Sequence, residues 1–226
     1  MACNAGPDII EDGLVFCVDA ANINSYPKTG TTWTDLKGGN AGTLTNGPTF
    51  SSDNAGSIST DGTNDIVQFS DDESIRINSG TSGTISMFVN VATNTGSFMA
   101  LLSKSGGYDR GYEISVDQRS GKSNGLAVRP NSGSNVANFF TGYLDKWVFI
   151  TVVFRGSDCI PYRNGEQYAQ AAVQTTTGSG DDLILASRGT NSWHANCEYG
   201  IVMIHNRQLT ADEIRQNYEA TVGRYT

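Results

Sequence analysis

Few residues of this chain have the types and spacing that catalysis on a sugar requires. Glycoside hydrolases use two carboxyl groups about 5–5.5 Å apart for retention, or about 6.5–9.5 Å apart for inversion. The nearest approach on one expected strand is Glu113 and Asp117, and four residues of strand separate two such groups by about 13 Å. This distance is too long for a pair that acts on one bond, so these residues do not predict a hydrolase.

Nucleophilic and nucleotide chemistry have no better support. The chain has two histidines, and Cys197 follows His194 by three residues in an expected loop, which is no signature of a nucleophile and its base. The second histidine, His205, lies in an expected strand and is better placed to pack or to cap a carbonyl. Neither the G-x-x-x-x-G-K-[ST] nor the G-x-G-x-x-G motif occurs. We therefore predict that the protein is not an enzyme.

Acidic turns make calcium the best-motivated metal ligand. Calcium takes six to eight oxygen ligands, and Asp61 and Asp65 fall in one turn, where they are the predicted metal ligands. The acidic runs at 71–73 and 181–182 are alternatives, and none of the three has EF-hand spacing. The alternative interpretation is a plain turn, in which Asp caps the backbone and Gly62 supplies a positive φ. No cofactor is required under either interpretation.

Aromatic residues beside Asp, Asn and Gly in expected loops indicate a surface for glycans. The predicted ligand-binding residues are Tyr108, Asp109, Tyr112, Trp193 and His194. Such rings offer an apolar face, while the polar neighbours offer hydrogen bonds. The alternative is that the aromatic rings plug the end of the core, and the sequence leaves both interpretations open.

Short strands must position these residues. Glycine occurs 26 times and charged residues make up 17% of 226 residues, a composition that suits strands joined by tight turns. Strand patterns recur about every ten to fifteen residues without helical segments between them, which indicates an antiparallel sandwich or jelly roll in one domain. The expected strands are 13–19, 57–60, 66–69, 84–91, 98–104, 112–117, 126–129, 147–154, 183–185 and 199–205.

Two turns and one helix have clear local signals. An Asn-Gly pair at 164–165 predicts a hairpin, and the turn at 61–65 predicts another between strands 57–60 and 66–69. Thr210 and Glu213 form a capping box at the start of a short C-terminal helix. Residues 1–12, rich in acids, are expected to form an arm that pairs at a sheet edge or reaches a neighbour.

Charge and cysteine content exclude several classes of partner. The formal net charge is −8, which argues against nucleic acid and anionic membranes as partners. No run of 18 apolar residues and no secretory signal are visible, so synthesis in the cytoplasm without classical export is expected. The four cysteines are Cys3, Cys17, Cys159 and Cys197. They lack zinc-site spacing, and free thiols are expected, with a pair between Cys159 and Cys197 as the alternative.

The ordered set of motifs resembles laminin-G-like, concanavalin A-like jelly rolls of the type found in tailed-phage structural proteins. The N-terminal matches are G-L-V-F-C-V-D-A-A-N at 13–22, S-Y-P at 25–27, T-L-T-N-G-P-T-F at 43–50 and G-S-I-S-T-D-G-T-N-D at 56–65. The C-terminal matches are the strand at 147–154, Y-R-N-G at 162–165, L-I-L at 183–185 and R-Q-L-T-A-D-E-I at 207–214. Together they extend over most of residues 13–220.

This resemblance implies an all-β, concanavalin A-like or laminin-G-like jelly-roll sandwich of two antiparallel sheets with one short C-terminal helix. Residues 1–12 are then an N-terminal arm, and residues 13–226 are the jelly-roll domain. The implied function is that of a non-catalytic virion structural protein, either a capsid decoration or a neck or tail-fibre component. Its partners are other virion proteins in the capsid, neck or tail. The alternative is a carbohydrate-binding lectin module, calcium-assisted or not, that contacts glycans on the host surface.

Overall fold

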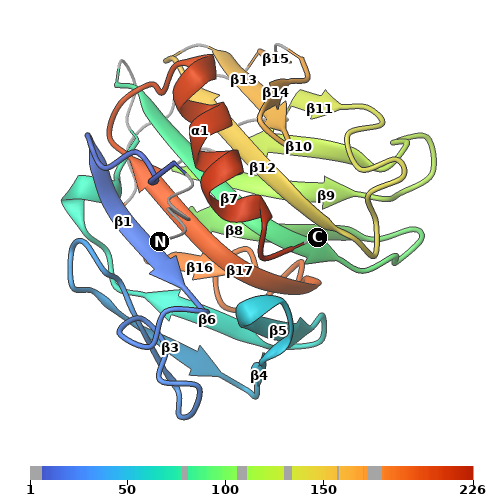
Figure 1. Cartoon of the computed structure of the whole chain (residues 1–226). Coiled ribbons are helices and arrows are strands. Elements are labelled where there is room, and N and C mark those ends of the chain that lie inside the picture. The colour runs from blue at the N-terminus through green and yellow to red at the C-terminus, as the bar shows by residue number, and fades with distance from the viewer. Residues whose placement is uncertain are drawn as a thin grey trace.

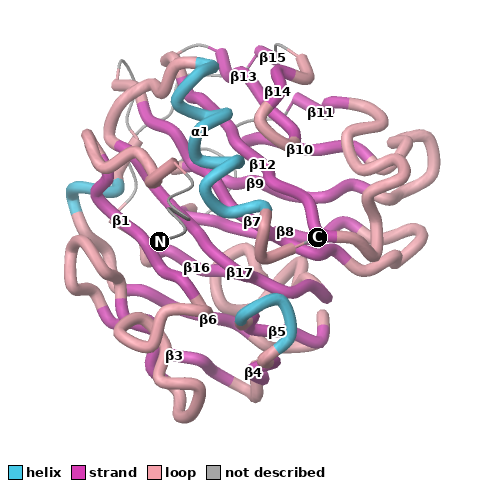
Figure 2. The backbone as a smooth tube through the Cα atoms, in the orientation of Figure 1, coloured by secondary structure: helices cyan, strands magenta, loops and turns pink. Residues whose placement is uncertain are grey.

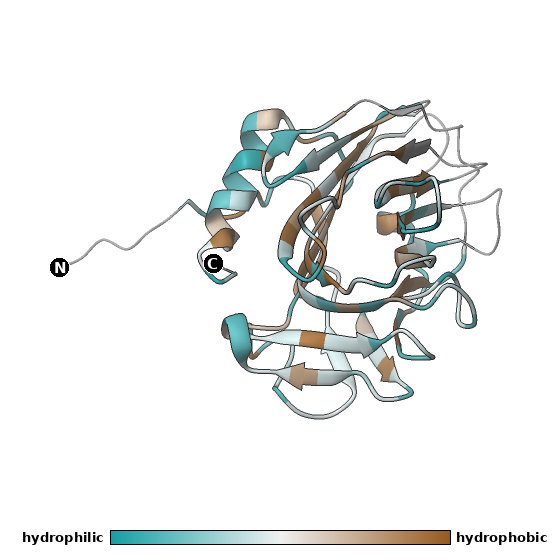
Figure 3. Cartoon of the chain, turned by 90° about the vertical axis from the view of Figure 1, so that its right-hand side faces the viewer, coloured by the Kyte–Doolittle hydropathy of each residue, from teal (hydrophilic) through white to brown (hydrophobic). Residues whose placement is uncertain are grey.

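The computed structural model describes residues 7–77, 81–105, 111–129, 134–156, 158–169, 171–172 and 180–225. Within these residues the strands form two antiparallel sheets, and one α-helix, α1 (Ala211–Val222), follows the last strand. The helix lies across the outer face of one sheet, and the second sheet lies behind it (Figures 1 and 3). The predicted all-β sandwich with a short C-terminal helix is therefore confirmed.

Sheet A is the layer beneath α1, and Figure 2 shows how its strands follow one another in space. Its path is β14 (Glu166–Gln167), β13 (Asp158–Arg163), β12 (Trp147–Phe154), β7 (Gly83–Val91), β17 (Asn196–His205), β5 (Ser57–Asp61) and β4 (Thr49–Ser51). Two further strands join it from the side, β1 (Leu14–Asp19) on β17 and β15 (Ala171–Ala172) on β13.

Sheet B is the second layer. Its order is β11 (Ser134–Val136), β10 (Gly125–Arg129), β9 (Tyr112–Asp117), β8 (Phe98–Lys104), β16 (Leu183–Leu185), β6 (Ile66–Phe69), β3 (Ala41–Thr45) and β2 (Thr32–Thr34). Two short 3-10 helices, η1 (Asp53–Ala55) and η2 (Glu73–Ile75), interrupt the connections.

The main core lies between the sheets, and a second apolar layer lies under α1. Strand β12 serves both, because its successive side chains point to opposite faces. Val148, Ile150 and Val152 belong to the core between the sheets, whereas Phe149 and Val153 pack beneath the helix. Sheet A is thus covered on both faces along this strand, in agreement with a sequence in which only Thr151 is polar.

One of the two predicted hairpins is confirmed and the other is wrong. Asn164 and Gly165 have φ angles of 51° and 80° and join the paired strands β13 and β14, as a two-residue hairpin requires. Strands β5 and β6, in contrast, lie in different sheets. The turn at 61–65 therefore carries the chain from one layer to the other, because β5 pairs with β4 and β17, whereas β6 pairs with β3 and β16.

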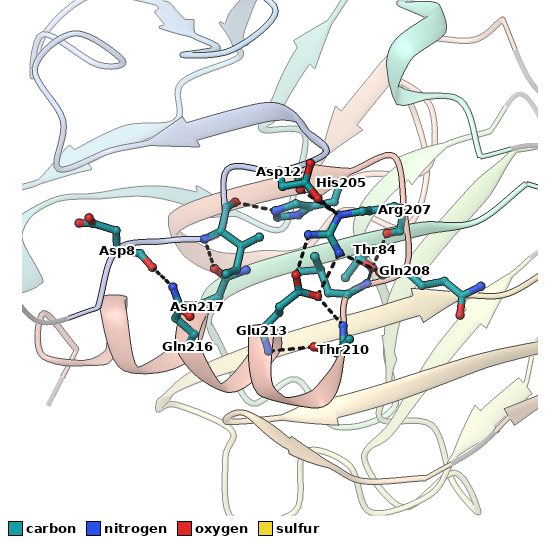
Figure 4. A network of polar contacts seen from close by, with 12 residues as sticks. Asp8, Asp12, Thr84, His205, Arg207, Gln208, Thr210, Glu213, Gln216 and Asn217 are labelled. Atoms are coloured by element: carbon teal, nitrogen blue, oxygen red, sulfur yellow. Dashed lines mark hydrogen bonds and ion pairs between the residues drawn. The ribbon is translucent and has the colours of Figure 1, made fainter.

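The described part of the N-terminal arm, residues 7–12, packs on its own domain. The backbone N–H of Ile10 donates to Asn217 Oδ1 (2.7 Å), and the Ile10 carbonyl lies 2.9 Å from His205 Nε2 (Figure 4). Gln216 Nε2 donates to the Asp8 carbonyl (2.7 Å). His205 thus caps a carbonyl, as predicted. Over these residues the arm binds α1 and the end of β17, and none of residues 7–12 lies in a strand.

The capping box that starts α1 is confirmed. The Glu213 N–H donates to Thr210 Oγ1 (3.3 Å), and the Thr210 N–H donates to Glu213 Oε2 (2.8 Å). Arg207 pairs with the same carboxylate at 2.7 Å, and this guanidinium lowers the pKa of Glu213 to about 2. The local sequence therefore fixes where the helix begins.

We expect Thr210→Ala to lower the free energy of unfolding by about 0.5–2 kcal/mol, because it removes the side-chain acceptor for a backbone donor of the first turn. Thermal unfolding followed by circular dichroism should show a melting temperature about 2–4 °C lower for each kcal/mol lost. Thr190→Ala, at an exposed loop position, is the matched control and should leave the melting temperature unchanged. Equal melting temperatures for the two variants would contradict the capping argument.

Three cysteines carry free, buried thiols: Cys17, Cys159 and Cys197. The alternative pairing of Cys159 with Cys197 is therefore wrong, and Cys3 lies outside the described residues. Burial raises the pKa of Cys17 and Cys159 to about 12, and that of Cys197 to about 11. In the part of the chain described, no helix has the length and apolar character needed to cross a bilayer.

Candidate functional site

Four of the predicted site residues gather at one end of the sandwich, on loops that we call the loop rim (residues 61–65, 92–97 and 186–196). Thr60 Oγ1 donates to the Ala195 carbonyl (2.7 Å), and Asp61 stands opposite Asn196 in the pairing of β5 with β17. The Ala92 N–H donates to the Asn196 carbonyl (3.1 Å). These contacts place the turn with Asp61 and Asp65 beside the segment that carries Trp193 and His194.

The two aspartates of the rim act first as turn caps. Asp61 Oδ1 accepts from the Thr63 N–H (2.7 Å), and Asp65 Oδ2 accepts from the Asp61 N–H (3.1 Å). The backbone hydrogen bond from Thr63 lowers the pKa of Asp61, whereas burial and then the Asp61 charge raise the pKa of Asp65. Asp65 is also close enough to His194 to interact with it electrostatically.

The fit of this turn to calcium is incomplete from side chains alone. Two carboxylates supply fewer oxygens than the six to eight that calcium takes, and both are already engaged with backbone donors. Among the residues described, no group of three or more His, Cys, Asp or Glu side chains has metal-binding geometry. Calcium at Asp61 and Asp65 therefore stays a prediction that needs backbone carbonyl oxygens as further ligands.

Trp193 is the exposed aromatic residue of the rim. Its side chain is 39% exposed, and its backbone has a φ of 59°, which is uncommon for a bulky residue. The segment is fixed by two backbone bonds, from Arg188 to Ser192 (2.8 Å) and from Ala195 to Ala186 (2.8 Å). The indole ring also meets the Phe98 ring edge to face at 5.1 Å. The ring is thus held in place and presented to solvent.

Three arginines that sequence reasoning missed surround Phe98. The guanidinium carbons of Arg119, Arg129 and Arg188 lie 5.0, 4.9 and 5.7 Å from the centre of its ring. Arg188 also lies 5.5 Å from the Trp193 ring, a distance at which cation–π attraction operates. No local motif marks this cluster, because its members come from β8, β10 and the loops after β9 and β16.

The same arginines neutralise the carboxylates considered for catalysis. Glu113 is 1% exposed, and Arg188 Nη2 donates to it at 2.9 Å. Arg119 pairs with Asp117 at 2.8 Å, and although burial opposes the effect, this guanidinium lowers the pKa of Asp117. Glu113 and Asp117 therefore serve as ion-pair partners of the half-buried Arg188 and the exposed Arg119.

Two polar hollows open beside the rim, one on either side of β5. The first has a volume of about 180 Å³ and the second about 290 Å³. Ser59 and Thr60 line both, and no lysine or arginine lines either. The carboxylates and amides are Asn90, Asp145, Asn196 and Glu198 in the first, and Asn46, Asp61 and Asp65 in the second. Such linings accept hydrogen bonds from hydroxyl groups and repel anions.

The remaining predicted residues do not join the rim. Tyr112 begins β9, is 1% exposed and donates its hydroxyl to the Ile75 carbonyl (2.9 Å). It is therefore a core residue, and its assignment to a glycan surface is corrected. Tyr108 and Asp109 lie outside the described residues. Cys197 is buried, and burial raises the pKa of its thiol to about 11, so it does not form a nucleophile with His194.

The fold and the rim define a β-sandwich of the lectin type, in which loops at one end form the candidate site. A family model described as the concanavalin A-like lectin/glucanases superfamily matches residues 61–215, more than half of the chain. The chain belongs to this superfamily. No curated protein matches it.

Solved structures with similar folds include toxin binding domains and a sialidase. The binding domain of Paraclostridial Mosquitocidal Protein 1 has a TM-score of 0.70 at 16% identity, over 91% of this chain and 52% of that one. The botulinum neurotoxin serotype D ligand binding domain, solved with N-acetylneuraminic acid, has a TM-score of 0.71 at 11% identity, over 94% and 52%. Trypanosoma rangeli sialidase has a TM-score of 0.69 at 13% identity, over 100% and 36%.

These likenesses show the fold alone, because every identity is low. The chain also spans only about half of the toxin binding domains and about a third of the sialidase. Binding domains and an enzyme thus share this fold, so function must be argued from the site.

Proposed function

We propose that this chain is a non-catalytic binding module whose ligand is a glycan held at the loop rim. The observation that carries the proposal is Trp193, an exposed ring in a fixed, left-handed backbone conformation on the loop rim, other residues of which line two polar hollows. An aromatic ring packs against the apolar face of a sugar, while the carboxylates and amides of the hollows accept its hydroxyl protons. The family description and the binding domains among the similar structures support this class of function.

The arrangement of carboxylates supports a role in binding rather than in hydrolysis. A glycosidase keeps one carboxyl group protonated and its partner ionised across the scissile bond. Here Glu113 and Asp117 are each paired with an arginine, so both carboxylates are already engaged in ion pairs. Asp61 and Asp65 are engaged as turn caps.

On a glycan array, we expect wild-type protein to give reproducible hits and Trp193→Ala to reduce them at least about tenfold, as for loss of an aromatic anchor. Ile23→Ala is the matched control, since Ile23 is an exposed apolar residue of a different loop. Repeating the array with EDTA tests whether calcium at Asp61 and Asp65 assists. An array without hits, or hits that survive Trp193→Ala, would overturn binding at the rim.

A second candidate function is that of a structural component of a tailed-phage particle, acting by protein–protein binding. The motifs from residue 13 to residue 65 carry this proposal, because their order resembles the opening of phage jelly-roll proteins. The module would be made in the host cytoplasm and assembled into the capsid, neck or tail. Edge strands such as β4 and β2 present unpaired backbone groups that a partner strand can bind. The two functions are compatible, since a virion protein can also bind a glycan.

Mass spectrometry of purified parent particles tests the second candidate. Hundreds of copies per particle would indicate a capsid decoration, and about a dozen would indicate a neck or tail position. Complete absence of the chain would overturn the virion proposal and leave the glycan-binding module.

A further inference from the structure

Five residues on five neighbouring strands of sheet A form one continuous row across its outer face. The strand register pairs Thr49 with Ser59, Ser59 with Glu198, Glu198 with Asn90, and Asn90 with Trp147. Directly paired residues point to the same side of a sheet. At about 4.8 Å between strands, this five-strand row is about 19 Å long.

The row is open to solvent, although three of its strands are central in the sheet. All five side chains are exposed or half-buried, whereas the flanking residues Ile58, Cys197 and Val89 are buried in the core. The next residue of β7 on the same face is Phe88, and Tyr225 stacks on its ring with the two ring centroids 4.3 Å apart. Among the described residues, Tyr225 thus packs at the Trp147 end of the row.

Two groups of the row are held in place by neighbours. Glu198 Oε2 accepts from Ser57 Oγ (3.0 Å), which orients the carboxylate. The Trp147 ring packs against the Tyr225 ring with centroids 4.6 Å apart. Ser59, Glu198 and Asn90, which are consecutive in the row, line the hollow of about 180 Å³. The row thus combines a fixed aromatic ring at one end with polar groups along its length, of which the Glu198 carboxylate is oriented by Ser57.

We propose that the five-strand row binds a neutral saccharide chain that lies across β4, β5, β17, β7 and β12. The inference rests on the proposed glycan-binding function and names the class of glycan. Glu198 and Asp145 line the hollow, and none of its lining residues in the described part of the chain is a lysine or arginine, so the charge of the site disfavours sialic acid and other anionic sugars. Hydroxyl groups, which donate to carboxylate and amide oxygens, fit this lining. A row of this length suits several consecutive sugar units rather than a single ring.

The test is isothermal titration calorimetry of the full chain with cellohexaose, mannohexaose and chitohexaose, and with sialyllactose as the anionic comparison. We expect at least one neutral hexaose to bind more tightly than sialyllactose, and the Trp147→Ala and Glu198→Gln variants to bind it at least about tenfold more weakly. Glu219→Gln, which makes the same charge change at an exposed position of α1, is the matched control.

Asn90→Ala is the second variant, because it truncates a half-buried polar side chain and leaves the contact between Trp147 and Tyr225 intact. It should weaken binding while keeping the wild-type melting temperature. If Trp193→Ala abolishes binding and the row variants do not change it, the row proposal is overturned and the binding function at the rim stands. Preference for sialyllactose would also overturn the row, whereas no binding of any array glycan would overturn both.

Discussion

Asp71→Ala is expected to lower the free energy of unfolding by about 3–5 kcal/mol, because it leaves a buried cation without its ionic partner. The Lys104 side chain is 1% exposed, and its ammonium group donates to Asp71 and to the Asp181 carbonyl. Arg76 binds the same carboxylate. Removal of Asp71 leaves the Lys104 charge inside the protein without its ionic partner.

Urea unfolding at neutral pH measures this loss. Asp71→Ala combined with Lys104→Met should recover much of the lost stability, since an apolar side chain of similar length replaces the buried charge. Asp53→Ala, at an exposed position, should change the free energy of unfolding by less than about 0.5 kcal/mol. A loss below about 1 kcal/mol for Asp71→Ala would show that Lys104 is solvated in solution.

The contribution of Asp71 to the free energy of unfolding should decrease as the pH is lowered. Hydrogen bonds and charge from Arg76 and then Lys104 lower the pKa of Asp71 from 3.8 to about 2. A lowered pKa in the folded state gives stability that is fully present above the unfolded value and is lost as pH falls through the folded one. The stabilities of wild-type protein and Asp71→Ala should therefore converge between about pH 4 and pH 2.

Phe69→Ala should cost about 3–5 kcal/mol through the cavity that it leaves in the core. The Phe69 ring is fully buried and meets Phe16 edge to face at 5.0 Å. Gly42 lies directly against the ring, and a Cβ atom at this position would overlap it. Gly42→Ala should therefore destabilise the protein as well, by about 1–3 kcal/mol through overpacking.

Thermal unfolding compares these two variants with Gly223→Ala, whose Cβ would meet no atom within 4 Å. The melting temperature should drop by roughly 10 °C for Phe69→Ala and by less for Gly42→Ala, and should hold for the control. A wild-type melting temperature for Gly42→Ala would mean that the Phe69 ring can move aside.

Local features of the fold could be predicted from the sequence because their causes are local. Thr210 and Glu213 specify the start of the helix through bonds made within one turn. The Asn-Gly pair at 164–165 specifies its hairpin through positive φ angles. The strand at 147–154 could be expected from its own sequence, in which only Thr151 is polar.

Predictions that depend on distant partners failed. The turn at 61–65 has the residue types of a hairpin turn, yet β5 and β6 lie in different sheets. Large apolar residues are usually buried, but Leu36 is 36% exposed and Trp147 is half-buried at the margin of the apolar layer under α1. Tyr112 is the first residue of β9, and its ring is buried. Because successive side chains of a strand point to opposite faces, a shift of one residue decides whether such a ring faces the core or the solvent.

The candidate site likewise contains residues that could be chosen from the sequence and contacts that could not. Asp61, Asp65, Trp193 and His194 could be chosen by residue type and loop context, and the structure gathers them on one rim. The ion pair between Glu113 and Arg188 joins residues 75 positions apart. The five-strand row likewise exists only through the register of four strand pairs, which no single segment encodes.

The alkylation rates of the three buried thiols can be used to measure conformational opening of the domain. A thiol reacts through its thiolate form and only where a reagent can reach it. Cys17, Cys159 and Cys197 lie on β1, β13 and β17, with pKa values raised to about 11–12. Each should resist alkylation until its own strand detaches. Comparing the three labelling rates would therefore distinguish local fraying of an edge from cooperative opening of the whole sandwich.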